Sequence, residues 1–124
     1  MIHRMNIPMT VSAIGALTKV SDHCITGKLL AIRYNKTDFA NGSTITITSA
    51  GTEQSLLAKT SINATETFYP RDVICTAAGV DSVFIASGQN VQLAQFVLYE
   101  EQIKVVVADG GVSKSGALEI YWED

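Results

Sequence analysis

Charged side chains are scarce in this chain of 124 residues. Only 17% of the residues are charged, whereas about 25% is typical of soluble domains. The nine Lys and Arg residues are spread singly along the sequence, so the chain lacks the basic face that binding to phosphates requires. We therefore expect neither nucleic acid nor an anionic membrane surface as a direct partner.

Long apolar runs are absent as well. No stretch reaches the roughly 20 apolar residues that a membrane-spanning helix requires. The charge-free segment Met5–Thr18 comes closest, but Asn6, Pro8, Thr10 and Ser12 interrupt it at every second position. This alternation is typical of a strand and differs from the apolar core of a signal sequence. We therefore expect no secretory signal in this segment.

Residues that bind metals are also few. Neither Cys24 nor Cys75 has further ligands at the close spacing of a metal site. We expect both cysteines to be small buried apolar side chains, and the sequence leaves a disulfide between them open. His3 and His23 have no carboxylate cluster beside them. The sequence thus predicts no metal and no cofactor.

Apolar patterns of period two run through most of the chain and predict an all-β fold. The clearest ones occupy Met5–Val11, Leu29–Tyr34, Thr44–Thr48, Ile103–Ala108 and Ala117–Trp122. No stretch keeps a helical period over three turns. About seven to nine short strands with frequent turn residues predict an antiparallel jelly roll or β-sandwich.

We expect one domain at this chain length. Its body would comprise residues 13–124, and residues 1–12 would form an N-terminal strand or an extended arm. Pro8 cannot donate a main-chain hydrogen bond, which favours an edge strand for this segment. The segment Ser12–Cys24 stays open between strand, loop and helical turn. The last two strands are predicted to form a hairpin across Asp109–Gly111.

Gly110–Ser115, with the sequence GGVSKS, resembles a phosphate-binding loop in composition. In that motif a glycine precedes the lysine and a helix follows. Here Ser113 precedes Lys114, and a strand pattern follows. We therefore interpret the segment as a turn.

Two other groups contain residue types used in catalysis. Asp22-His23-Cys24 places an acid, a base and a thiol side by side, but neighbours in a strand point to opposite faces, and catalytic pairs are usually distant in sequence. The acidic pairs Glu100-Glu101 and Glu123-Asp124 fit a solvated rim better than the acid and base of a glycosidase. We therefore predict no catalytic residues and no enzyme.

Five groups of residues, taken in order, resemble a known family. They are Gly27–Tyr34 (GKLLAIRY), Asp38–Thr48 (DFANGSTITIT), Asn63–Thr65 with Tyr69–Arg71, Gln102–Ala108 with Gly110-Gly111, and Lys114–Gly116. Together they resemble small virion proteins of tailed phages and prophages, some of which are capsid cement or decoration proteins. The resemblance covers about residues 27–122 and consists of strand and turn patterns.

This resemblance implies a structural protein of the virion, bound to the outside of a phage capsid after synthesis in the cytoplasm of a bacterial host. The expected partners are the major capsid protein and further copies of the chain, as a homodimer or homotrimer. Such a protein requires no active site, and many repeated contacts strengthen its attachment. The alternatives are a neck, tail or fibre-anchoring component, and a carbohydrate-binding β-sandwich module.

Composition also indicates assembly. From Thr44 to Ala58 the only charged residue is Glu53, and exposed neutral surface is commonly covered by a partner. We expect the N-terminal segment to add a strand to a neighbouring subunit and aromatic side chains to anchor the contact. The candidate contact residues are Met5, Ile7, Pro8, Met9, Tyr69 and Tyr121.

Four further aromatic side chains are expected in the core or at its rim. They are Phe39, Phe68, Tyr99 and Trp122. If they instead lay flat on one exposed face with Tyr69 and Tyr121, the carbohydrate-binding alternative would gain support.

Overall fold

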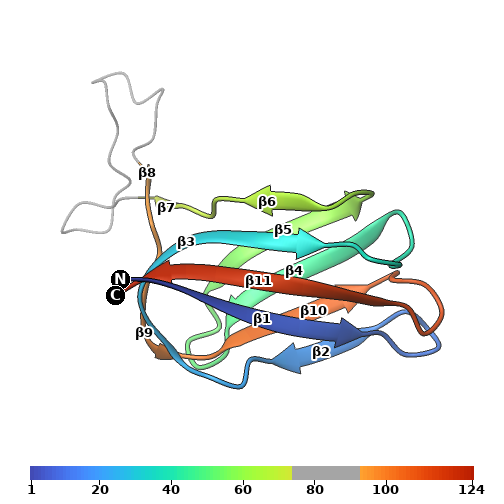
Figure 1. The fold of residues 1–124 in the computed structure, drawn as a ribbon, viewed down its shortest axis with the longest axis horizontal. Helices are drawn as coiled ribbons and strands as arrows, with labels where there is room; N and C mark the ends of the chain where they lie inside the picture. The colour runs from blue at the N-terminus through green and yellow to red at the C-terminus, as the bar shows by residue number, and fades with distance from the viewer. Residues whose placement is uncertain (74–92) are drawn as a thin grey trace.

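The computed structural model describes residues 1–73 and 93–124, which form β-strands connected by loops (Figure 1). These ranges contain eleven strands and no helix. The strands are β1 (Ile2–Thr10), β2 (Leu17–Val20), β3 (Ile25–Asn35), β4 (Ser43–Ser49), β5 (Ser55–Ile62), β6 (Glu66–Phe68), β7 (Asp72–Val73), β8 (Leu93–Ala94), β9 (Val97–Glu101), β10 (Ile103–Ala108) and β11 (Ser115–Glu123).

Two antiparallel sheets make up the body of the protein (Figure 1). The five-stranded sheet has the order β1-β11-β3-β6, with β9 also paired to β3, and the four-stranded sheet has the order β2-β10-β4-β5. Strands β7 and β8 form a separate pair. The chain crosses between the sheets from β1 to β2, from β3 to β4 and from β10 to β11, as in a jelly roll. The predicted fold, an antiparallel jelly roll or sandwich, is confirmed.

A single core fills the space between the two sheets. Every second side chain of a strand points inward: on β4, Ile45 and Ile47 are buried, and Thr46 between them lies on the outer face. Burying one such side chain stabilises the fold by about 1.5–3 kcal/mol. The largest fully buried side chains are Tyr34, Phe39, Met9, Ile25, Leu29, Ile32, Ile45, Ile47, Ile62, Ile103, Leu118 and Ile120.

The N-terminal segment is an edge strand of this body rather than an arm. β1 pairs with β11 along its whole length, from Ile2 opposite Glu123 to Thr10 opposite Ser115. Pro8 therefore lies on an outermost strand, where its missing N–H costs no ladder bond. Residues 1–12 belong to the same unit as the rest of the described chain, because their apolar side chains enter the common core.

The predicted hairpin near the end of the sequence is wrong. β10 pairs with β2 and β4, whereas β11 pairs with β1 and β3 in the other sheet. Each strand turns its own apolar face to the core, and the loop between them crosses from sheet to sheet. Alternation predicted both strands, but it carries no information about which sheet each strand joins. The segment Ser12–Cys24, left open by the sequence, contains β2.

The backbones of β3 and β11 approach closely at one corner of the five-stranded sheet. Gly27 has a φ of 132°, and a Cβ there would lie 2.2 Å from Glu123 O. Only glycine fits this approach, since any side chain would overlap main-chain atoms. This contact closes the corner at which the ends of β1 and β11 also meet (Figure 1).

Candidate interaction surfaces

Three of the six predicted contact residues lie in the protein's own core. Met5, Ile7 and Met9 are 8%, 2% and 2% exposed, because the odd-numbered side chains of β1 pack between the sheets. Their apolar side chains are therefore largely taken up by the protein's own core and present little surface to a partner. Pro8 alternates with them and is exposed.

The two predicted aromatic anchors have different surroundings. Tyr69 follows β6 and is 65% exposed. Tyr121 lies on the outer face of the five-stranded sheet, where its hydroxyl donates to Glu119 Oε2 at 2.6 Å. This hydrogen bond to a carboxylate raises the pKa of Tyr121, and the nearby Arg4 guanidinium partly offsets the rise. The Tyr121 hydroxyl is thus held by a hydrogen bond within the protein. The Tyr69 side chain has no such hydrogen bond to another described residue.

The other aromatic residues do not share one face with these two. Phe39 is buried, and Phe68 is half-buried against the core. Tyr99 on β9 is 76% exposed, whereas Trp122 packs on the core side of β11 and stacks on His3. These six aromatic side chains, all within the described residues, therefore form no flat platform of the kind that the carbohydrate-binding alternative requires.

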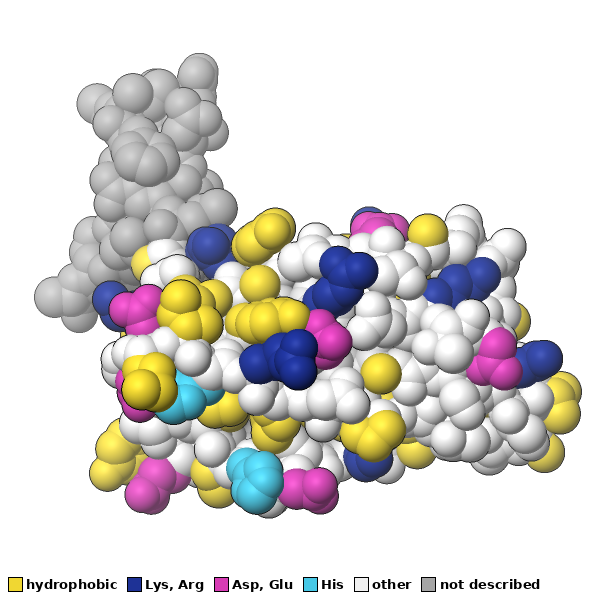
Figure 2. All heavy atoms as spheres, viewed as in Figure 1, with side chains coloured by type: hydrophobic (Ala, Val, Ile, Leu, Met, Phe, Trp, Pro, Cys, Tyr) yellow, Lys and Arg dark blue, Asp and Glu magenta, His cyan; other side chains and the backbone are white. Residues whose placement is uncertain are grey.

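Polar and charged side chains cover the outer face of the five-stranded sheet. Arg33 donates from Nε to Asn35 Oδ1 at 3.2 Å and from Nη1 to Thr67 Oγ1 at 3.3 Å. Glu119, which accepts from the Tyr121 hydroxyl, lies opposite Arg33 in the strand register. Figure 2 shows side chains of both charge signs interspersed over this side of the molecule. A partner packing closely here would have to desolvate groups that already have partners.

The outer face of the four-stranded sheet is mostly uncharged. Thr46 at its centre lies opposite Val106 of β10 and Ala58 of β5. Val20 and Val106 are 39% and 37% exposed. Lys104 brings a charge to this side of β10. We call the uncharged part of this surface the neutral face; its residues are Thr18, Val20, Thr44, Thr46, Thr48, Ala58, Val106 and Ala108.

A groove of about 450 Å³ opens between the edge strands of the two sheets. The Arg4–Pro8 part of β1 forms one wall, and the end of β2 with the loop after it forms the other. Met5 and Ile7 line it from the core side, and Trp122 also contributes. At one end Lys19 Nζ spans the groove and donates to Pro8 O at 2.5 Å.

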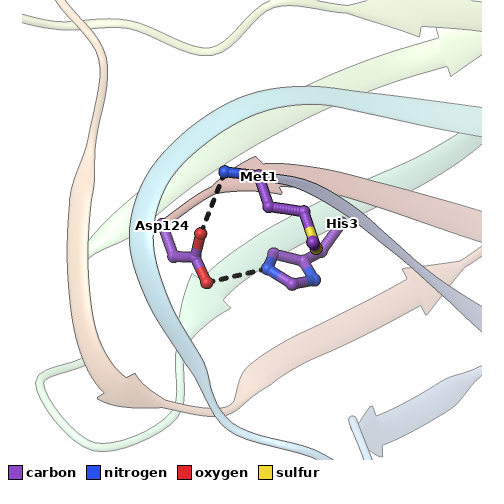
Figure 3. A network of polar contacts seen from close by, with 3 residues as sticks. All are labelled: Met1, His3 and Asp124. Carbon is purple, nitrogen blue, oxygen red and sulfur yellow. Dashed lines mark hydrogen bonds and ion pairs between the residues drawn. The ribbon is translucent and has the colours of Figure 1, made fainter.

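Polar contacts join the ends of β1 and β11 beside this groove (Figure 3). His3 Nε2 lies 2.9 Å from Asp124 Oδ2, and the amino group of Met1 lies 3.2 Å from Asp124 Oδ1. The hydrogen bond with His3, followed by the one with the amino group, lowers the pKa of Asp124. The ring of His3 also stacks on Trp122, with 5.2 Å between centroids. These contacts fasten the edge strand to its neighbour.

The segment Gly110–Ser115 lies in the loop between β10 and β11 except for Ser115, which begins β11, so the predicted turn is confirmed. Two of its amides are bonded within the protein: Gly110 N donates to Gly15 O at 3.0 Å, and Ser113 N donates to Ser12 O at 3.1 Å. These groups are not available to hold a phosphate.

Asp22, His23 and Cys24 are exposed in the loop between β2 and β3. The prediction that Cys24 is buried is wrong, because the loop carries it to the surface; Cys75 lies outside the described residues. Among residues 1–73 and 93–124, no group of three or more His, Cys, Asp and Glu side chains could hold a metal ion. The same ranges contain no helix long and apolar enough to cross a membrane.

Comparisons with family models, with curated proteins and with solved structures gave no match. The likeness to phage virion proteins is therefore a hypothesis that rests on the sequence patterns alone.

Sequence reasoning missed the neutral face as a unit and missed the groove. The alternation in Thr44–Thr48 was a signal for an uncharged outer face, but its continuation onto three other strands depends on the register. The groove depends on β1 and β2 being the edges of different sheets. No local pattern encodes that arrangement.

Proposed function

We propose that this protein is a structural component of a tailed-phage virion that binds the outside of the capsid and holds neighbouring capsid subunits together. The observation that carries the proposal is the neutral face, a sheet surface of threonine, valine and alanine side chains. The likeness of the sequence to capsid cement proteins names the partner, which is the major capsid protein.

The chemistry of the neutral face suits adhesion. Thr46 and Val106 lie opposite each other and can be covered without removing a charge from water, so desolvation of these two residues opposes binding only weakly. Lys104 lies opposite Thr48 and brings the nearest charge. The methyl groups of Thr and Val contribute by apolar burial. Each contact is modest, but many copies on a symmetric shell act together. On the outer face of the five-stranded sheet, Arg33, Glu119 and Tyr121 are engaged in polar contacts that a closely packed partner would have to desolvate.

Binding to capsid shells tests this proposal. Purified protein is mixed with shells of the phage that encodes it, and the bound fraction is measured by co-sedimentation over a range of protein concentrations. Thr46→Arg places a charge at the centre of the neutral face and should weaken binding roughly tenfold or more, because an unpaired charge would be buried in the contact. Thr10→Arg is the matched control, since Thr10 is exposed on the other sheet, and it should bind like the wild type.

Each outcome has a defined meaning. Failure of the wild type to bind shells overturns the proposal. Equal binding of Thr46→Arg and the wild type overturns the assignment of the neutral face. Quantification of the protein in intact virions separates the alternatives, since a cement protein is present in many copies and a neck or tail component in few.

A further inference from the structure

The edge of β1 beside the groove presents main-chain groups that β11 does not use. In an antiparallel pair, residues that bond to the neighbouring strand alternate with residues whose N–H and C=O point away. At one end Asp124 N donates to Met1 O (3.3 Å), and at the other Val11 N donates to Lys114 O (2.9 Å). Both bonds involve odd-numbered residues of the β1 segment. The even-numbered residues of β1 therefore direct their main-chain groups away from β11.

These outward groups are protected at one end of β1 only. Pro8 has no N–H, and its carbonyl accepts from Lys19 Nζ; proline and lysine are common protection against unwanted strand pairing. Arg4 and Asn6 have no such cover. In the part of the chain that the structure describes, no hydrogen bond reaches their outward N–H and C=O groups. The segment before Pro8 can accept a further strand.

We propose that this segment pairs with the same segment of a second copy, so that two five-stranded sheets join edge to edge in a two-fold dimer. In an antiparallel register centred on Met5, Arg4 lies opposite Asn6 of the second copy. Each such pair exchanges two main-chain hydrogen bonds, and the two-fold axis repeats them. The N–H of Ile2 then lies opposite the carbonyl of Pro8 in the second copy. In the unpaired chain, Lys19 Nζ donates to this carbonyl.

A register centred on Arg4 would pair as many main-chain groups, but it would place the two Arg4 side chains opposite each other, where like charges repel. Two further symmetric registers fit less well for other reasons. Centring on Ile7 would place Asn6 opposite Pro8, which has no N–H to give. Centring on His3 would place Arg4 opposite Ile2 and Met5 opposite Met1, so the Met5 side chains that line the two grooves would not meet. The register centred on Met5 also places each Arg4 opposite a neutral side chain, so like charges do not face each other directly.

The groove supports a second copy as the occupant. Met5 lines the groove from the core side, and in this register it lies opposite Met5 of the second copy, which covers the apolar floor of both grooves. Both copies present the same β1 segment, so each outward N–H of one copy can meet an outward C=O of the other, as a two-fold interface requires. The contact is small, so we expect the dimer to dissociate on dilution. This inference is independent of capsid binding, which uses the other sheet.

The test measures the molar mass of the full chain by sedimentation equilibrium across a wide concentration range, together with amide hydrogen exchange. Asn6→Pro removes an outward N–H while leaving the β1–β11 bonds in place. The matched control is Val20→Pro on the edge of β2. Ser21 N donates to Ile103 O (2.8 Å), so the N–H of Val20 also points outward.

We expect the wild type and Val20→Pro to double in mass as concentration rises, and Asn6→Pro to keep the mass of one chain. In the wild type, exchange at the amides of Arg4 and Asn6 should slow by about tenfold or more as the dimer forms, whereas the amide of Met5 should be slow at all concentrations. A wild type that stays a single chain overturns the proposal, as does a dimer in which those two amides still exchange fast. The exchange measurement decides the matter even if Asn6→Pro fails to fold.

Discussion

Replacing Tyr34 by phenylalanine should stabilise the protein. Tyr34 is fully buried on β3, and its ring stacks on Phe39 with 6.1 Å between centroids and an 18° interplanar angle. Its hydroxyl oxygen is the one buried side-chain polar atom without a hydrogen-bond partner among the residues that the structure describes. Ser43 lies near enough to influence the Tyr34 hydroxyl, and its own hydroxyl donates to Ala40 O at 2.7 Å.

The expected size of the effect follows from two opposing contributions. A buried polar group without a partner costs about 1–3 kcal/mol. Removing the oxygen leaves a small void whose cost is at most about 1 kcal/mol. Tyr34→Phe should therefore raise the free energy of unfolding by about 1 kcal/mol, which corresponds to an increase in Tm of about 3–5 °C for a domain of this size.

The pH dependence provides a second signature of the same group. Burial raises the pKa of Tyr34 above its ordinary value of 10.0, and Ser43 only partly offsets this. Because the pKa is raised in the folded state, ionisation of Tyr34 favours the unfolded state: this group leaves the stability of the wild type unchanged below pH 10 and lowers it as pH rises beyond that value. The stability gap between Tyr34→Phe and the wild type should therefore widen above pH 10. Tyr121 titrates in both proteins and cancels in the comparison.

Urea unfolding of the two proteins, followed by circular dichroism at neutral and alkaline pH, measures both effects. Tyr34→Leu is the control, because it removes the same hydroxyl together with the aromatic ring. Loss of the ring stack should make Tyr34→Leu less stable than Tyr34→Phe by at least about 0.5–1.5 kcal/mol. A Tyr34→Phe protein that is less stable than the wild type at neutral pH would refute the reasoning, since it would show that the hydroxyl has a favourable partner.

Three further predictions concern stability and can be checked by the same unfolding measurements. Asp124→Asn should destabilise the protein at neutral pH and lose this effect in acid, because the lowered pKa of Asp124 beside His3 contributes stability only while the carboxylate is charged. Gly27→Ala should cost on the order of 3 kcal/mol through overlap with the β11 backbone, whereas Gly42→Ala should cost only about 1 kcal/mol because its left-handed position has open space. Ile47→Ala should cost about 2–5 kcal/mol, since that side chain is fully buried in the core.

The sequence predicted the strands well because alternation is a local property of the chain. Thr44–Thr48 alternates between threonine and isoleucine, and β4 spans Ser43–Ser49 with the isoleucines inside. The turn at Gly110–Ser115 was equally local. Strand partners were not predictable in this way. β10 and β11 both have clear alternation, yet they join different sheets, because the choice depends on which edges the rest of the chain leaves open.

The same limit explains the errors about candidate residues. Alternation in Met5–Val11 correctly separated two sides of a strand, but it could not tell whether the apolar side meets the protein's own core or a partner. Pairing with β11 decided that question for the core. Cys24 was misjudged because residue type predicts burial only on average, and a loop position between β2 and β3 overrides that average.

If both proposed surfaces act, they should reinforce each other. Pairing two antiparallel edges about an axis perpendicular to the sheets keeps the same side of each sheet facing the same way. Both neutral faces of the dimer would then point toward one shell, and the second contact would form at a high effective concentration. Asn6→Pro should therefore bind capsid shells at least about tenfold more weakly than the wild type, although its neutral face is intact.

The measurement that separates the two contributions is a comparison of shells with free capsid protein. On isolated capsid protein, which offers one site at a time, Asn6→Pro and the wild type should bind equally, while Thr46→Arg should be weak on both targets. On shells, Asn6→Pro should fall between the wild type and Thr46→Arg, since it loses the second contact and keeps the first. Equal binding of Asn6→Pro and the wild type to shells would show that the copies attach independently, and the edge of β1 would then have no part in adhesion.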